Sequence, residues 1–174
     1  MSGSALQAPL FVQRIIVGVG DLAVSDNAEI VLSTYALGSC IGVVAFDEHA
    51  RVGGMLHLML PDSGIAPDRV ARQPAMFADT GLELFARELI GVRAERERLR
   101  LVVAGGANVL CGPDPFRIGE RNTRVTLDFL DRHGYAVRHT SVGGGVNRAL
   151  HLELASGTVT LKTPLEETRF SLAL

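Results

Sequence analysis

A cysteine and a histidine lie on two neighbouring apolar segments that the sequence predicts to form a β-hairpin. Segments 40–46 and 51–60 are apolar and partly β-branched, and the polar residues 47–50 between them are typical of a turn. A loop of two or four residues centred on this turn places Cys40 directly opposite His57. A thiol beside an imidazole can lose its proton and act as a nucleophile. The pair therefore predicts covalent cysteine chemistry.

The imidazole needs a partner that orients it, and Thr34 is the predicted one. The bend at residues 36–38 can fold the preceding strand back, which brings the Thr34 hydroxyl close to His57. A hydroxyl orients the ring without adding charge. The turn residues Gly38 and Ser39 keep the backbone close to the thiol.

Simpler explanations exist for each residue taken alone. Cys40 also fits a buried structural cysteine, and His57 fits an ordinary core or surface residue. Their predicted opposition favours the catalytic interpretation, in which a neighbouring imidazolium lowers the pKa of the thiol. Cys111 has no histidine placed beside it by local pairing and is expected to be inert.

The surrounding elements predict one layered α/β domain over residues 10–174, after a loose tail at 1–9. Both faces of the Cys40–His57 hairpin are apolar, which indicates an inner layer covered on each side. Apolar runs and turn signals predict strands at 11–19, 29–33, 99–104, 135–142, 149–154 and 158–162, and helices at 75–90 and 120–132.

Composition excludes several classes of function. The 174 residues are 47% hydrophobic, which is enough for a full core, and the net charge of −2 argues against a nucleic-acid partner. No apolar run approaches the roughly 18 residues of a membrane span, and the N-terminus lacks a secretory signal pattern. We therefore expect a cytoplasmic protein with no integral membrane segment, in which both cysteines are free thiols.

Neither a cofactor nor a metal is predicted. Residues 18–23 superficially match a dinucleotide fingerprint, but a strand-like run follows them where that motif requires a helix. The histidines at 49, 133, 139 and 151 show no metal-ligand spacing with the cysteines.

Five motifs closely resemble the chemoreceptor glutamine deamidase family, CheD, and the resemblance extends in order from about residue 14 to residue 163. They are Leu37-Gly38-Ser39-Cys40, the run Gly53-Gly54-Met55-Leu56-His57-Leu58-Met59-Leu60-Pro61-Asp62-Ser63, Phe77-Ala78-Asp79-Thr80, Gly105-Gly106-Ala107-Asn108 and Ile118-Gly119-Glu120-Arg121-Asn122. The chain departs from the family pattern at Ser141, where an acid is usual, and at Asn147, where a glycine is usual.

The resemblance implies an α/β/β/α-type sandwich with mixed, largely antiparallel sheets, similar to the catalytic domain of cytotoxic necrotizing factor toxins. It also implies hydrolysis of selected glutamine side chains on methyl-accepting chemotaxis receptors, through a thioester. By matching position, Cys40 is the nucleophile, His57 the acid and base, and Thr34 the third member of the site. Backbone donors around Gly38 and Ser39 are then expected to support the oxyanion.

A different class of function is also compatible with the resemblance. The protein could be a binding module that docks to receptors or to a CheC-type phosphatase, with turnover secondary or lost. Selective alkylation of Cys40 over Cys111 near neutral pH would favour the enzyme.

Overall fold

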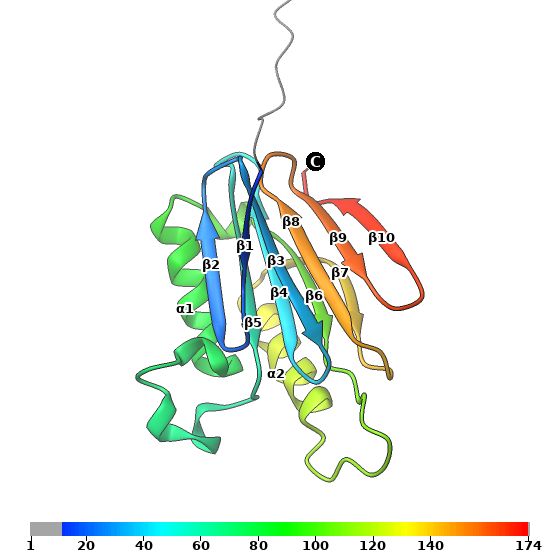
Figure 1. The fold of residues 1–174 in the computed structure, drawn as a ribbon. Helices are drawn as coiled ribbons and strands as arrows, with labels where there is room; N and C mark the ends of the chain where they lie inside the picture. The colour runs from blue at the N-terminus through cyan, green and yellow to red at the C-terminus, as the bar shows by residue number, and fades with distance from the viewer. Residues whose placement is uncertain (1–11, 174) are drawn as a thin grey trace, which may run out of the picture.

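Two five-stranded sheets pack face to face in the computed structural model, which describes residues 12–173 (Figure 1). The predicted tail at 1–9 lies outside these residues. The outer sheet has the spatial order β1 (Gln13–Ile16), β3 (Ile30–Leu37), β8 (Arg148–Glu153), β9 (Thr158–Lys162) and β10 (Glu167–Ser171). The central sheet has the order β2 (Asp21–Ser25), β5 (Val52–Leu58), β4 (Ile41–Asp47), β6 (Arg100–Gly105) and β7 (Ala136–Val142).

Both sheets are mixed and largely antiparallel. The pairs β1–β3 and β6–β7 are parallel, and the other neighbouring strands run antiparallel. The predicted hairpin of β8 and β9 is confirmed.

Two α-helices, α1 (Ala78–Gly91) and α2 (Ile118–Arg132), cover the central sheet on the side away from the outer sheet (Figure 1). On α1 the buried residues Ala78, Leu82, Phe85 and Leu89 recur every three to four positions, which forms one apolar stripe. Short 3-10 helices occur at Ser63–Ile65, Pro67–Arg69, Pro74–Met76 and Arg96–Arg98.

Strands β4 and β5 form the middle of the molecule, and every residue in both is buried. Alternate side chains point to opposite faces: Val43 and Leu56 pack toward the helices, whereas Val44 and Met55 pack toward the outer sheet. The predicted inner layer with two apolar faces is thus confirmed.

The predicted layered α/β sandwich with two mixed sheets is confirmed. The order of its layers within residues 12–173 is α/β/β, because both helices lie on the central sheet. Along β8 the burial alternates: Leu150 and Leu152 are buried, whereas His151 and Glu153 are partly exposed. A strand with one polar face can leave that face in solvent, so the outer sheet needs no helix on its far side.

Two strands were missed by sequence reasoning. Strand β2 lies at the edge of the central sheet, and β10 lies at the edge of the outer sheet. Neither contains a fully buried residue. An edge strand with little buried apolar surface gives a weak hydrophobic pattern, so it resembles a loop in the sequence.

Candidate active site

The hairpin of β4 and β5 forms as predicted, but its register differs by two residues. His57 is paired with Gly42, and Asp47 with Val52, so the loop contains residues 48–51. The expectation that Cys40 stands directly opposite His57 is therefore wrong. The turn chemistry explains the shift: the Asp47 carboxylate accepts the Ala50 N–H at 3.0 Å, which makes Asp47 the last strand residue.

A shift of two residues leaves every side chain on its predicted face, since side chains alternate with a period of two. Cys40 immediately precedes β4, and continuing the ladder would place it across from Met59 and diagonal to His57. Diagonal neighbours lie roughly 7–8 Å apart, within reach of a long or aromatic side chain. Cys40 and His57 thus lie at the same, open end of the hairpin.

Thr34 reaches His57 from the other sheet. Its strand, β3, ends at a tight bend, where Ala36 has a φ of 56° and the Gly38 N–H donates to the Ala36 carbonyl at 2.9 Å. The chain then crosses to the central sheet and begins β4. Thr34 consequently projects into the space between the sheets, where its Oγ1 lies 2.7 Å from Nδ1 of His57.

The contacts of the Thr34 hydroxyl determine which nitrogen of His57 carries the proton. Thr34 Oγ1 donates its only proton to the carbonyl of Val17 at 2.7 Å. It must therefore accept from Nδ1–H of His57. The neutral ring then has its lone pair on Nε2, and this buried atom has no hydrogen-bond partner among residues 12–173.

The protonation states of the two side chains are set mainly by burial. Burial lowers the pKa of His57, and the Val17 carbonyl offsets part of this change. Burial raises the pKa of the Cys40 thiol, and the Cys40 backbone N–H offsets part of that rise. The sequence-based expectation of a lowered thiol pKa is not met, because burial disfavours the thiolate and a buried neutral imidazole supplies no positive charge. The resting pair is a thiol and a neutral base.

Backbone contacts hold the turn that carries the thiol. The Gly38 carbonyl accepts the Ala107 N–H, and the Cys40 carbonyl accepts the Gly106 N–H, both at 2.8 Å. In contrast, the N–H groups of Ser39 and Cys40 donate to no oxygen within the described part of the chain. Both N–H groups thus lack an oxygen acceptor among the described residues, although the Cys40 N–H interacts with its own sulfur, whereas the Gly38 N–H is already used in the bend.

The glycine that ends β6 permits this close packing. Gly105 has a φ of 117°, and a Cβ on it would lie 2.1 Å from the Cys40 carbonyl oxygen. Only glycine fits both the conformation and the contact. Close packing against the Cys40 carbonyl therefore accounts for a glycine at this position.

Sequence reasoning missed Asn122 as part of the site. Its Nδ2 donates to the carbonyls of Ser39 and Met59, each at 2.9 Å, and the residue is fully buried. A signal was present, since counting back from Leu130 in helical steps gives Thr126, Asn122 and Gly119, all buried on α2. Two polar residues on a buried helix face indicate a specific contact.

A cavity of about 340 Å³ opens beside the thiol. Its lining includes Ser39, Cys40, Met59 and Leu60, together with Ala107, Asn108, Val109, Leu110, Asp114, Phe116 and Ile118. Leu110 is 72% exposed and Phe116 is 71% exposed, so the rim presents large apolar side chains to solvent.

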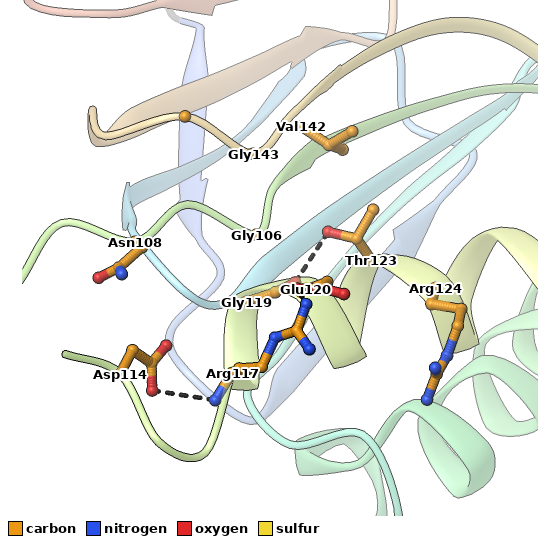
Figure 2. Close-up of a pocket in the computed structure, with 11 residues that line it drawn as sticks. Gly106, Asn108, Asp114, Arg117, Gly119, Glu120, Thr123, Arg124, Val142 and Gly143 are labelled. Carbon is orange, nitrogen blue, oxygen red and sulfur yellow. Dashed lines mark hydrogen bonds and ion pairs between the residues drawn. The ribbon is translucent and has the colours of Figure 1, made fainter.

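A second cavity, of about 590 Å³, adjoins the first and shares Asn108 and Asp114 with it (Figure 2). It lies at the start of α2, where Asp114 accepts the Arg117 N–H at 2.9 Å and Thr123 donates to the Gly119 carbonyl at 2.8 Å. Only the first of the two cavities is lined by Cys40.

The two departures from the family pattern have defined surroundings. Ser141 accepts a hydrogen bond from Nε of Arg148 at 2.9 Å, so a neutral oxygen takes the place of an acid. Asn147, where a glycine is usual, has no positive φ, and its Oδ1 lies 3.1 Å from where a Cβ on Gly38 would be. Asn147 therefore packs against the turn that carries Cys40.

Among residues 12–173, no three histidine, cysteine, aspartate or glutamate side chains gather as a metal-binding group. Within the same residues, none of the helices combines the length and apolar character that a membrane span requires. Both cysteines are free; Cys40 is half-buried and Cys111 is exposed.

Comparison with known proteins identifies the family. Residues 59–163 match the family model described as CheD chemotactic sensory transduction. A probable chemoreceptor glutamine deamidase CheD from Solibacter usitatus is 44% identical over 150 residues, which cover 86% of this chain and 89% of the relative. A probable chemoreceptor glutamine deamidase CheD 1 from Syntrophus aciditrophicus is 38% identical over 156 residues, covering 88% of this chain and 98% of the relative. This chain therefore belongs to the CheD family.

Proposed function

We propose that this protein deamidates glutamine side chains of chemoreceptors, with Cys40 as nucleophile and His57 as acid and base. Its relatives are named as probable chemoreceptor glutamine deamidases. The observation that carries the proposal is the Val17–Thr34–His57 chain, which leaves an unprotonated Nε2 at the Cys40 end of the hairpin. A buried base without a partner is ready to receive a proton.

The first half of the reaction forms a thioester. Nε2 of His57 takes the thiol proton as the Cys40 sulfur attacks the carboxamide carbon of glutamine. A C–S bond forms, and the electron pair of the C=O bond moves to oxygen. When this intermediate collapses, the C–N bond breaks and His57 returns the proton to the departing ammonia.

The second half regenerates the enzyme. Water enters the site and gives a proton to Nε2 of His57 as its oxygen attacks the thioester carbon. The C–S bond breaks, the sulfur recovers a proton from His57, and the product is a glutamate side chain. In both halves Thr34 accepts Nδ1–H, which keeps the ring in the tautomer that the reaction needs.

The N–H groups of Ser39 and Cys40 are the proposed donors to the oxyanion. They are backbone groups on a turn held by Gly106 and Ala107, so they are oriented before substrate binds. Removal of one such donor typically costs about 10²–10³ in rate. Gly38 supports this turn through its carbonyl rather than as a donor.

The test is conversion of glutamine to glutamate on isolated chemoreceptor signalling helices, measured by mass spectrometry. Wild type and Cys111→Ala are expected to convert the same glutamines at the same rate, whereas Cys40→Ala converts none. Equal conversion by wild type and Cys40→Ala would refute the proposal. Cys111 is a suitable control because it is a free thiol on an exposed loop.

A docking role on receptors or on a CheC-type phosphatase remains the competing prediction, and a cytoplasmic location is predicted with either role. Conversion by wild type excludes docking as the sole function. A binding measurement with a purified CheC-type phosphatase, compared between wild type and Cys40→Ala, tests this partner separately from turnover.

A further inference from the structure

The hairpin ladder includes His57, which pairs with Gly42, but it does not reach Cys40. Strand β4 begins at Ile41 and β5 ends at Leu58, so Cys40 and Met59 lie just beyond the paired region. The separation of the thiol from the imidazole therefore depends on contacts outside the ladder. Gly106 and Ala107 attach the thiol turn to the segment that follows β6, but among the described residues their N–H groups make no backbone hydrogen bond to the end of β5.

The side chain of Asn122 joins these two segments. One amide nitrogen donates to the carbonyl of Ser39, which precedes Cys40, and to the carbonyl of Met59, two residues after His57. Both distances are 2.9 Å, and the residue is fully buried in α2. Asn122 therefore holds both sides of the open hairpin end from a rigid element.

The chemistry of the contacts determines the orientation of this amide. Carbonyl oxygens only accept hydrogen bonds, so the Asn122 nitrogen must face Ser39 and Met59. A flipped amide would place Oδ1 against two oxygens. Replacing the amide by a carboxylate would create the same repulsion, and protonation would restore only one donor.

We propose that Asn122 is a positioning residue that sets the separation between the Cys40 sulfur and Nε2 of His57. The inference rests on the proposed function of these two side chains. A displacement of about 1 Å at a reacting pair can cost about 10²-fold in rate. Loss of the Asn122 donors is therefore expected to act on kcat.

Three variants separate this role from general damage to the fold. Asn122→Asp replaces both donors by acceptors at nearly constant shape, and Asn122→Ala removes the donors without adding charge. Thr126→Val is the matched control, because Thr126 is equally buried one helical turn away and its hydroxyl has no partner within the described residues. Thermal unfolding of each variant establishes that it is folded, and Asn122→Ala carries the test if Asn122→Asp does not fold.

The first measurement is deamidation of receptor signalling helices. We expect kcat to fall about 10²-fold in the Asn122 variants while KM changes less than about threefold, because the cavity rim that meets the substrate is intact. Thr126→Val should retain the kcat of wild type. An Asn122 variant that is folded and keeps the wild-type kcat overturns the inference.

The second measurement needs no deamidase activity. Iodoacetamide alkylation of Cys40 near neutral pH, with exposed Cys111 as the internal reference, reports how well His57 assists the thiol. In Asn122→Ala the alkylation rate of Cys40 should fall to the rate found in His57→Gln. In the double variant the rate should be no lower than in either single variant, because both changes remove the same assistance from His57. Additive losses in the double variant would show that Asn122 does not act through the Cys40–His57 pair.

The two measurements distinguish the two proposals. If wild type converts no receptor glutamine, the proposed function fails. The alkylation rates of the Asn122→Ala, His57→Gln and double variants still decide whether Asn122 sets the Cys40–His57 separation. If wild type converts glutamine and the losses in alkylation rate are additive, only the positioning role of Asn122 fails.

Discussion

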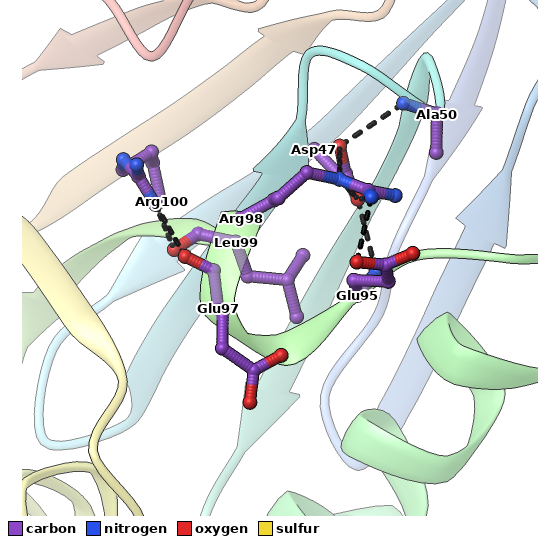
Figure 3. A network of polar contacts seen from close by, with 7 residues as sticks. All are labelled: Asp47, Ala50, Glu95, Glu97, Arg98, Leu99 and Arg100. Atoms are coloured by element: carbon purple, nitrogen blue, oxygen red, sulfur yellow. Dashed lines mark hydrogen bonds and ion pairs between the residues drawn. The ribbon is translucent and has the colours of Figure 1, made fainter.

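The two ends of the β4–β5 hairpin each bury a titratable side chain, but they satisfy it differently. At the closed end, Asp47 is fully buried and its carboxylate accepts the N–H groups of Ala50 and Glu95 and the guanidinium of Arg98 (Figure 3). At the open end, His57 is 1% exposed, and among residues 12–173 only its Nδ1 has a hydrogen-bond partner.

This difference separates a structural role from a chemical one. Burial alone would raise the pKa of Asp47, but the hydrogen bonds from Arg98, Ala50 and Glu95 lower it overall, so the carboxylate stays charged and bound. Burial lowers the pKa of His57 with no charged partner to oppose it. A satisfied group stabilises the fold, whereas an unsatisfied one retains the capacity to exchange a proton.

The largest expected effect is on turnover at the open end. His57→Gln removes the acid and base while keeping a polar side chain, so deamidation of receptor helices should slow by about 10²–10⁴. Its unfolding free energy should change less than that of an Asp47 variant. His49→Gln, on the exposed hairpin loop, is the control and should match wild type. If His57→Gln deamidated receptor helices at the wild-type rate, His57 would have no chemical role at the open end of the hairpin.

The next largest effect is on stability at the closed end. Asp47→Ala leaves Arg98 and two backbone N–H groups without their acceptor, so urea unfolding should show a loss of about 3 kcal/mol. The rate per folded molecule should stay at the wild-type value. Glu167→Gln breaks an exposed ion pair with Lys162 and should cost far less than Asp47→Ala. A similar cost for both variants would contradict the structural role of Asp47.

A smaller effect is expected when the orienting hydroxyl is removed. Thr34→Val keeps the shape of the side chain but leaves Nδ1–H of His57 unpaired. An unpaired buried donor costs about 1–3 kcal/mol, and the protonated ring is destabilised more than the neutral one. The deamidation rate should fall about 10–100-fold, less than in His57→Gln. Thr160→Val, at another buried threonine, should leave the rate unchanged. A Thr34 variant as slow as His57→Gln would mean that the hydroxyl does more than orient the ring.

The smallest expected effect is on the pH dependence of the unfolding free energy, to which His57 and Asp47 contribute in different pH ranges. The folded pKa of His57 lies below the ordinary value of about 6.5, so below that pH the unfolded chain binds more protons and stability falls as pH decreases. The folded pKa of Asp47 is also lowered, so its contribution is complete above about pH 4 and is lost only as pH falls through the folded value.

The measurement is the unfolding free energy of wild type and His57→Gln between neutral pH and about pH 5, where Asp47 stays charged. The slope should be shallower in the variant. His151, whose pKa burial also lowers, is present in both proteins and cancels in the difference. Identical slopes would show that His57 does not titrate differently in the folded and unfolded chains.

Local pattern predicted much of the fold but not every register. The apolar runs around Cys40 and His57 indicated a buried hairpin, and alternation assigned its two faces correctly. The pairing was off by two because the Asp47–Ala50 hydrogen bond and the positive φ of Arg51 place the loop at residues 48–51. Turn chemistry decides such details, and it is only weakly encoded in hydrophobicity.

Asn122 illustrates what a pattern of apolar residues misses. The apolar pattern gave Asn122 no role, whereas the structure places it on the buried face of α2, against the hairpin end. The contact becomes meaningful only when Ser39 and Met59 are known to lie there together. Sequence shows which face of a helix a residue occupies, but not what covers that face.

By itself, the sequence determined that Cys40 and His57 share one face of a buried hairpin, because side-chain alternation is local and survives a shift of two residues. Only the tertiary structure decided which nitrogen of His57 carries the proton and which residues hold the hairpin end in place. Thr34 comes from the other sheet, Val17 lies 17 residues before Thr34, and Asn122 lies 83 residues after Ser39. Contacts over such distances depend on how the two sheets and α2 pack, and no local periodicity encodes that packing.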